Sequence, residues 1–320
     1  AASSSMSEAP SRHACSACKG SGKYGLMRKV CNFCQGSGKI EGLPIHWCNQ
    51  PSSEANSMGK PVLLTEQSDS DTLAGLRRML DTDPTQLGTG RDVKQPGRHY
   101  SLSLHKAWRI EHGNNYRTYM TEIRNFANKF QGKKAARDPK LRAPLVSGSF
   151  KLPGVLNRKI GEVRLLHGTS PSHVMDIIHN GLNENFSRGL FGKGTYLAED
   201  AGKCDQYCKQ DLGAHGLRDN LDGYDPDCFY VFVVRTILGH FVRTDKGVGD
   251  YVQDLDHGGP VWADDDFREL ANIHGVKPAE PYHSLIAEKR FLRYREFVKY
   301  KASQTYVEYL VAYRRPSRPR

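Results

Sequence analysis

The sequence predicts an α+β domain built on a twisted antiparallel β-sheet. Residues 228–238 are apolar except at Arg235 and Thr236, which is typical of a central strand buried on both faces. Residues 295–300 and 306–313 alternate apolar and polar side chains, as antiparallel strands do. Few other segments have helical periodicity, so strands are expected to dominate the domain.

Three further elements are expected between residues 66 and 150. Residues 70–79 have the spacing of a helix, with a serine or aspartate able to cap its start. Residues 100–110 alternate apolar and polar side chains and predict a strand. Residues 115–130 place aromatic and apolar residues at helical spacing, which indicates a helix packed on the core. A basic, proline-containing loop is expected at 131–150.

Two short stretches in the middle of the chain are expected to meet at one cleft. The apolar run 163–169 ends in His-Gly-Thr, and a glycine-rich turn after position 190 leads into Tyr196. Between them, residues 172–180 predict a helix that stops at a glycine. A strand, a helix and a second strand in this order would bring the His-Gly pair and the tyrosine to the same place.

Length and composition fit a globular protein. The chain has 320 residues, of which 38% are hydrophobic and 25% charged, and these are ordinary proportions. No apolar run approaches the roughly 20 residues of a membrane helix, so no membrane association is expected. Residues 1–13 lack the apolar core of a secretory signal and are expected to be a disordered leader. An intracellular location, nuclear or cytoplasmic, is therefore expected.

Four of the eight cysteines form one pattern with the spacing C-x2-C-x12-C-x2-C. They are Cys15, Cys18, Cys31 and Cys34. Four thiolates in two such pairs suit a closed, tetrahedral, structural zinc site. The glycines after each pair allow the backbone to turn its N–H groups toward the sulfur atoms. We therefore expect a zinc ribbon over residues 14–42 and a linker over residues 43–65.

Both copies of the repeat C-x-x-C-x-G-x-G resemble the zinc-binding region of DnaJ-type co-chaperones. That region usually carries four copies, whereas this chain has two, and no HPD tripeptide of a J-domain occurs. The resemblance implies one zinc ion and argues against a co-chaperone. The module could hold a client protein, bind nucleic acid or cap the next domain.

The formal net charge of +11 favours a polyanionic partner. Basic residues gather near both ends of the chain and at 133–142. Contact with nucleic acid and simple solvation of surface loops are both compatible with this charge, because charge alone supplies no element that reads a groove.

Four motifs occur in the order and approximate spacing of the poly(ADP-ribose) polymerase catalytic domain, which the chain resembles from about residue 60 to 315. The motifs are His167-Gly-Thr169, Gly192-Lys-Gly-Thr-Tyr196-Leu-Ala, Asp205-Gln-Tyr207-Cys and Tyr294-Arg-Glu296-Phe-Val-Lys-Tyr300. Residues 296–313 are particularly similar to the tankyrase branch. The resemblance implies an ADP-ribosyltransferase fold, with twisted antiparallel sheets around an NAD cleft, over residues 66–315, followed by a basic tail at 316–320.

This family transfers ADP-ribose from NAD and expels nicotinamide through a transition state of oxocarbenium character. By resemblance, the Gly168 backbone would pair with the nicotinamide amide, and His167 would bond a hydroxyl of the adenosine ribose. Tyr196 and Tyr207 would sandwich the nicotinamide ring. Glu296 would hold the nicotinamide ribose and stabilise the positive charge. The implied catalytic residues are His167, Tyr196 and Glu296.

Four more positions complete the expected site. Thr169 follows the His-Gly pair and is expected to help bind NAD. Cys204 stands where many relatives have a serine that donates to the nicotinamide amide, and because a thiol is a weaker donor, a lower nicotinamide affinity is expected. Lys203 and Tyr294 match residues on the acceptor side of the family members that form chains.

The main prediction is therefore an enzyme that transfers ADP-ribose from NAD to protein acceptors and can extend a poly(ADP-ribose) chain. One alternative is transfer of a single unit, or transfer to nucleic acid delivered by the zinc ribbon and the basic tails. A second alternative is a catalytically silent scaffold that binds NAD or ADP-ribose. The expected ligands are NAD as substrate and one structural zinc ion.

Overall fold

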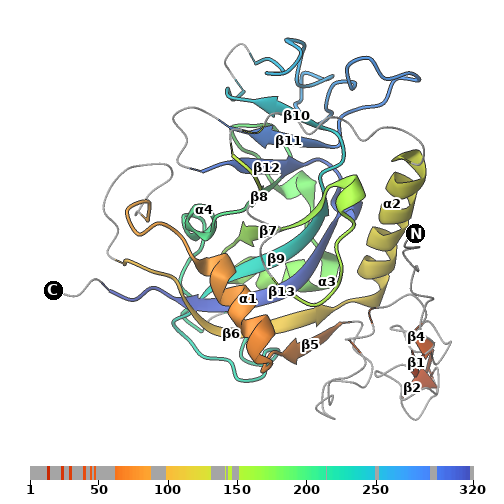
Figure 1. Cartoon of the computed structure of the whole chain (residues 1–320). Coiled ribbons are helices and arrows are strands. Elements are labelled where there is room, and N and C mark those ends of the chain that lie inside the picture. The colour runs from red at the N-terminus through yellow and green to blue at the C-terminus, as the bar shows by residue number, and fades with distance from the viewer. Residues whose placement is uncertain are drawn as a thin grey trace, which may run out of the picture.

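The computed structural model describes residues 62–87, 99–130, 141, 143–145, 151–213, 215–248, 252–288 and 294–317, together with 13–14, 23–24, 29–30, 39–40, 44 and 47. In this part of the chain, nine strands form one sheet in the order β10-β11-β12-β8-β7-β9-β13-β6-β5 (Figure 1). The sheet-rich α+β architecture matches the predicted class.

The sheet strands in chain order are β5 (Leu63–Glu66), β6 (Ser103–Glu111), β7 (Glu162–Gly168), β8 (Thr195–Ala198), β9 (Phe229–Ile237), β10 (Phe241–Thr244), β11 (Ser284–Ala287), β12 (Glu296–Lys299) and β13 (Thr305–Arg314). As predicted, β9 is buried along its whole length, because it lies between β7 and β13. The predicted antiparallel arrangement has one exception in the described part of the chain. β10 and β11 are parallel, since the long segment between them carries the chain back before β11 begins.

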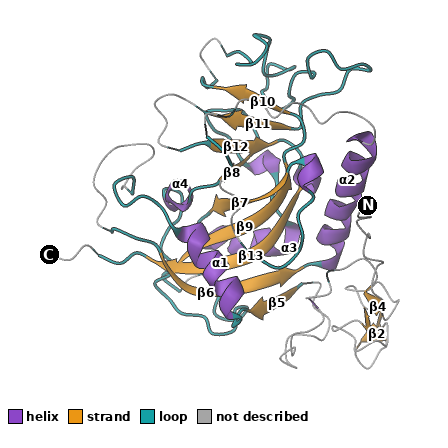
Figure 2. Cartoon of the chain, viewed as in Figure 1, coloured by secondary structure: helices purple, strands orange, loops and turns teal. Residues whose placement is uncertain are grey.

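Helices cover both faces of the sheet (Figure 2). They are α1 (Ser70–Leu80), α2 (Gly113–Phe130), α3 (Val174–Asn180) and α4 (Ala201–Asp205). Apolar residues of α1 and α4 pack together on one face, and those of α3 pack on the opposite face. The predicted cap of α1 is confirmed, because the Asp69 carboxylate accepts a hydrogen bond from the Thr72 N–H at 2.8 Å.

Strand β13 shows how both faces are filled. Tyr309, Val311 and Tyr313 point to the side of α1 and α4, whereas Leu310 and Ala312 point to the side of α3. Successive side chains of a strand face opposite ways, so this strand is apolar on both faces because both are covered. No helix among the described residues combines the length and the apolar character needed to span a membrane.

Two domain limits differ from those predicted. The sheet begins at Leu63, inside the predicted linker, because β5 completes the edge of the sheet by pairing with β6. At the other end, the Tyr100 N–H donates to the Pro316 carbonyl, and Ser317 bridges to His99. The first two residues of the predicted tail therefore belong to the domain. Trp47, also in the predicted linker, is buried.

The N-terminal region contributes four very short strands. β1 (His13–Ala14) pairs with β4 (Lys39–Ile40), and β2 (Lys23–Tyr24) pairs with β3 (Lys29–Val30). The four cysteines predicted to bind zinc lie outside the described residues, so the zinc ribbon stays a prediction.

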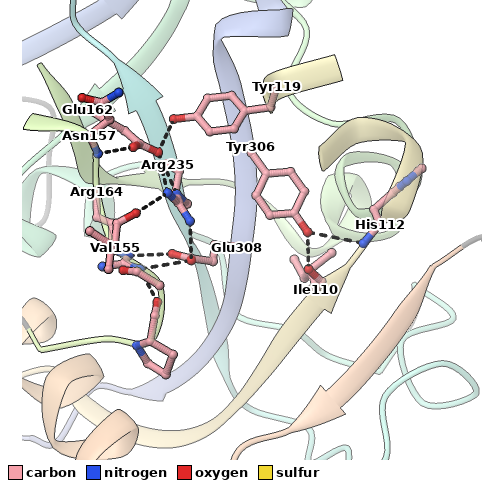
Figure 3. Close-up of polar contacts among 12 residues, drawn as sticks. Ile110, His112, Tyr119, Val155, Asn157, Glu162, Arg164, Arg235, Tyr306 and Glu308 are labelled. Carbon is pink, nitrogen blue, oxygen red and sulfur yellow. Dashed lines mark hydrogen bonds and ion pairs between the residues drawn. The ribbon is translucent and has the colours of Figure 1, made fainter. Parts of the chain in front are cut away.

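A cluster of buried charges joins the adjacent strands β7, β9 and β13 (Figure 3). Arg164 of β7 and Arg235 of β9 are directly opposite each other, an arrangement that repels unless it is neutralised. Glu308, at the bulge of β13, accepts from Arg164 Nε at 2.6 Å, and Glu162 accepts from Arg235 Nε at 2.9 Å. The Tyr119 hydroxyl of α2 also donates to Glu162 at 2.9 Å. The cluster therefore fixes α2 and β13 to β7, the strand that carries His167 near its end.

Replacing Glu308 by alanine is expected to destabilise the domain, because two buried guanidinium groups would lose their shared partner. Removing one member of a buried ion pair costs about 3–5 kcal/mol. Urea unfolding followed by circular dichroism would measure the change. Glu66→Ala is the matched control, since the carboxylate of Glu66 pairs with Lys106 at the surface and its loss should cost about 1 kcal/mol at most. Equal losses for the two variants would contradict the role given to the cluster.

Candidate active site

The candidate site lies between β7 and β8, the two neighbouring strands of the sheet that separate from each other. Strands β7 and β8 are joined by a single residue pair, Leu166 with Ala198. Beyond this pair the two strands make no further residue pair. Instead, Nδ1 of the His167 imidazole lies 2.9 Å from the Tyr196 carbonyl oxygen. The separation leaves a cavity of about 410 Å³, a size that suits a small-molecule site.

The structure brings seven of the predicted residues to this cavity. They lie on β7, β8, β12 and α4 and in the turn after α4. They are His167, Gly168, Tyr196, Lys203, Cys204, Tyr207 and Glu296. The segment 186–190, which begins at the last residue of the 3-10 turn Glu184–Phe186, forms another wall of the cavity. Residues far apart in the sequence therefore meet at one place, as the four motifs predict.

Gly168 occupies the closest approach between β7 and α4. A Cβ atom at this position would lie 2.3 Å from the carbonyl oxygen of Cys204 and 2.8 Å from its carbonyl carbon. Both are backbone atoms, so no rotamer change could relieve the clash. Glycine is required here because the end of β7 packs directly against the α4 backbone.

His167 is neutral at physiological pH, because burial lowers the pKa of its imidazole below the usual value. The Tyr196 carbonyl can only accept a hydrogen bond, so Nδ1 carries the proton and donates to it. The second ring nitrogen, Nε2, is then an acceptor. In this tautomer, one imidazole nitrogen can accept a hydrogen bond from a hydroxyl of a ligand.

Tyr196 is held rigidly by the glycine-rich turn before it. Its hydroxyl donates to the Gly192 carbonyl and accepts from the Phe191 N–H, both at 2.8 Å. A Cβ atom on Gly189 would lie 2.5 Å from the Tyr196 ring, so this segment also needs a glycine. Because both hydrogen bonds of the hydroxyl are made within the turn, the aromatic ring is the part of Tyr196 offered to a ligand. Tyr207 lines the same cavity and is 40% exposed.

A buried ion pair forms part of the cavity wall. Lys203 Nζ of α4 lies 3.0 Å from Glu296 Oε1, at the first residue of β12. The same ammonium group lies 5.4 Å from the centroid of the Tyr207 ring, close enough for a cation–π contact. The pair places a carboxylate of fixed orientation at the cavity, next to an aromatic ring.

Cys204 lines the cavity as a neutral thiol. Burial raises the pKa of this thiol well above its usual value, and a nucleophilic or readily oxidised cysteine would need the thiolate. In its neutral form the Cys204 thiol is a weak hydrogen-bond donor.

Two predicted residues do not line the cavity. The Tyr294 hydroxyl is buried beneath α4 and donates to the Gln86 carbonyl at 2.9 Å, and its acceptor-side role stays a prediction. Gly202 of α4 leaves room for this hydroxyl, since a Cβ atom there would lie 2.5 Å from it. Thr169 is buried beside the cavity without lining it.

One cluster that fixes α4 was missed by sequence reasoning. Asp205, the last residue of α4, lies 2.9 Å from His99 Nε2 and accepts from the Tyr313 hydroxyl at 2.7 Å and from Arg315 Nε at 2.8 Å. Burial works to raise the pKa of Asp205, but the hydrogen bonds from His99 and Tyr313 and the charge of Arg315 hold it below the usual value. The partners come from two segments that lie far from Asp205 in the sequence, one at His99 and one at the end of β13, so no local pattern could have identified them.

Comparison with known proteins assigns the chain to a family. Residues 89–315 match the family model described as the poly(ADP-ribose) polymerase catalytic domain, and this is well over half of the chain. The protein belongs to that family. Its sheet-rich α+β structure fits the ADP-ribosyltransferase fold.

Two named relatives resemble this chain over a shorter stretch. Over 157 residues, it is 31% identical to the protein mono-ADP-ribosyltransferase PARP11 of Mus musculus and to that of Homo sapiens. The matched stretch is 48% of this chain and 42% and 41% of the mouse and human proteins. The chain thus covers less than half the length of these relatives.

Proposed function

We propose that this chain is an NAD-dependent ADP-ribosyltransferase that attaches a single ADP-ribose unit to protein acceptors. The proposal rests on the position of His167, Tyr196 and Glu296 at one cavity. Membership of the poly(ADP-ribose) polymerase family supports it. The main prediction from the sequence is a transferase whose residues are compatible with chain extension. Single-unit transfer is now preferred, because the matched relatives are named mono-ADP-ribosyltransferases.

The residues of the cavity fit the nicotinamide half of NAD. The nicotinamide ring would stack between Tyr196 and Tyr207, and its carboxamide would pair with the backbone of Gly168. The Cys204 thiol would add a weak hydrogen bond to the carboxamide oxygen. His167 Nε2 would accept a hydrogen bond from a hydroxyl of the adenosine ribose, which the tautomer set by Tyr196 makes available.

The reaction would break the bond between ribose C1′ and the nicotinamide nitrogen. Nicotinamide leaves as a neutral molecule with the bonding electron pair, and positive charge develops on the ribose. Glu296 would accept a hydrogen bond from a ribose hydroxyl and stabilise this charge, while Lys203 keeps the carboxylate in position. The acceptor nucleophile then bonds to C1′ and loses its proton.

Incubation with NAD labelled in the adenosine part, followed by denaturing electrophoresis, tests this function. A discrete labelled band with release of nicotinamide is expected, whereas a smear of high mass would support chain extension instead. Absence of both label and nicotinamide would contradict the transferase and leave the silent scaffold. Parallel reactions with protein, RNA and DNA acceptors would identify the class of acceptor.

Asp205→Asn is expected to raise the KM for NAD by about 10- to 100-fold, because small displacements of groups that position a substrate have effects of this size. The change removes the charge that holds Arg315 and loosens α4, which carries Lys203 and Cys204. Initial rates of nicotinamide release at several NAD concentrations would show a larger effect on KM than on kcat. Asp254→Asn is the matched control, because Asp254 is equally buried but lies outside the cavity. Equal effects of the two changes would contradict a positioning role.

The proposal includes one structural zinc ion bound by Cys15, Cys18, Cys31 and Cys34. Support comes from the spacing of the two cysteine pairs. Elemental analysis of the purified protein is expected to give one zinc per chain. A variant with serine at Cys31 and Cys34 should lose the metal, and zinc retained in that variant would contradict the assignment.

A further inference from the structure

Trp47 is buried although it lies in the predicted linker. Its side chain is 3% exposed. The centroid of its ring lies 5.0 Å from that of Tyr116 and 6.1 Å from that of Tyr306. The Trp47 N–H also donates to the Pro44 carbonyl at 3.0 Å, which closes a turn just before the side chain. A tryptophan in a solvated linker would have no such partners.

The residues around Trp47 belong to the ADP-ribosyltransferase domain. Tyr116 lies in the first turn of α2, and Tyr306 lies near the start of β13. The rings of Tyr116 and Tyr306 meet edge to face at 5.1 Å, and Tyr119 packs 6.2 Å from Tyr306. We refer to Tyr116, Tyr119 and Tyr306 as the tyrosine cup.

The tyrosine cup is held in place by polar contacts that do not involve Trp47. The Tyr306 hydroxyl donates to the Ile110 carbonyl at 2.6 Å and accepts from the His112 N–H at 3.3 Å (Figure 3). The Tyr119 hydroxyl donates to Glu162 of the buried charge cluster. The cup is therefore built by the domain itself, which reduces the ordering required when an aromatic residue binds.

We propose that Trp47 is an anchor that docks the N-terminal cysteine module, residues 14–42, onto the tyrosine cup. Six residues separate Ile40, the end of β4, from Trp47, and the Cα atoms of these two residues can lie at most about 25 Å apart. The docked tryptophan thus confines the module to one side of the domain. This inference rests on the packing of Trp47 and depends neither on the transferase activity nor on zinc.

Fluorine NMR of the full chain labelled with 5-fluorotryptophan would test the anchor. The chain has three tryptophans, and the Trp47 signal is identified as the one that disappears in Trp47→Phe. In the unmodified protein, this signal should show almost no shift between H2O and D2O, as expected for a buried ring. Tyr116→Ala should produce a solvent shift at Trp47, while Trp262, which packs in another cluster, serves as an internal control. A full solvent shift of Trp47 in the unmodified protein would overturn the proposal.

Small-angle X-ray scattering of the same full-length proteins tests whether Trp47 confines the module. Trp47→Ala should increase the radius of gyration and the maximum dimension, whereas Trp47→Phe, which retains an aromatic ring, should leave both closer to those of the unmodified protein. Identical scattering from the alanine variant and the unmodified protein would contradict the anchor. NAD turnover with a small acceptor should stay unchanged in both variants. The activity assay therefore tests the proposed function independently of the anchor.

Discussion

Replacing Glu296 by glutamine is expected to lower kcat for ADP-ribosyl transfer by about 10²- to 10³-fold. Groups that stabilise charge in a transition state typically contribute this much. Glutamine keeps the size and a hydrogen-bonding oxygen but loses the negative charge that faces the developing oxocarbenium. The pair with Lys203 at 3.0 Å would also be lost. Nicotinamide release at saturating NAD measures the effect.

Glu288→Gln is the matched control for this change. Glu288 is also buried, directly follows β11 beside β12, and pairs with Arg243 at 3.0 Å and Arg295 at 2.9 Å. It does not line the cavity. We expect Glu288→Gln to reduce stability more than turnover. Wild-type turnover in Glu296→Gln, or an equal loss in both variants, would contradict the catalytic role of Glu296.

Replacing Gly168 by alanine is expected to raise the Kd for NAD by at least about 100-fold, because positioning errors near 1 Å have effects of this size. The new Cβ atom would overlap the Cys204 carbonyl, so β7 and α4 must move apart and displace His167, Lys203 and Cys204 together. Overpacking of this kind also costs about 1–3 kcal/mol of stability. Calorimetric titration with NAD and urea unfolding would measure both effects.

Gly259→Ala provides the control, because a Cβ atom at Gly259 would meet no atom within 4 Å. This variant should bind NAD and unfold like the unmodified protein. Unchanged NAD affinity in Gly168→Ala would show that the contact between β7 and α4 does not shape the site.

Elements set by local pattern were predicted well from the sequence. The apolar run of β9, the capping aspartate of α1 and the glycine after α3 each act on their immediate neighbours, and the structure has all three elements. The parallel pairing of β10 with β11 was missed, because strand direction depends on where a long loop returns rather than on the strand itself.

The site was predicted through motifs rather than through local physics. Nothing in the surroundings of Glu296 along the chain indicates that Lys203 lies 3.0 Å away. Contacts with residues outside the motifs could therefore not be predicted. Examples are the hydrogen bond from Tyr294 to the Gln86 carbonyl and the packing of Trp47 against Tyr116. In each case the partner lies in a segment whose position only the folded chain determines.

A crystal structure of the full chain with a non-hydrolysable NAD analogue would test the central claim most directly. We predict that the nicotinamide ring lies between Tyr196 and Tyr207, with its carboxamide against the backbone of Gly168 and the nicotinamide ribose within hydrogen-bonding distance of Glu296. Binding of the analogue elsewhere on the domain, with the cavity between β7 and β8 empty, would contradict the account.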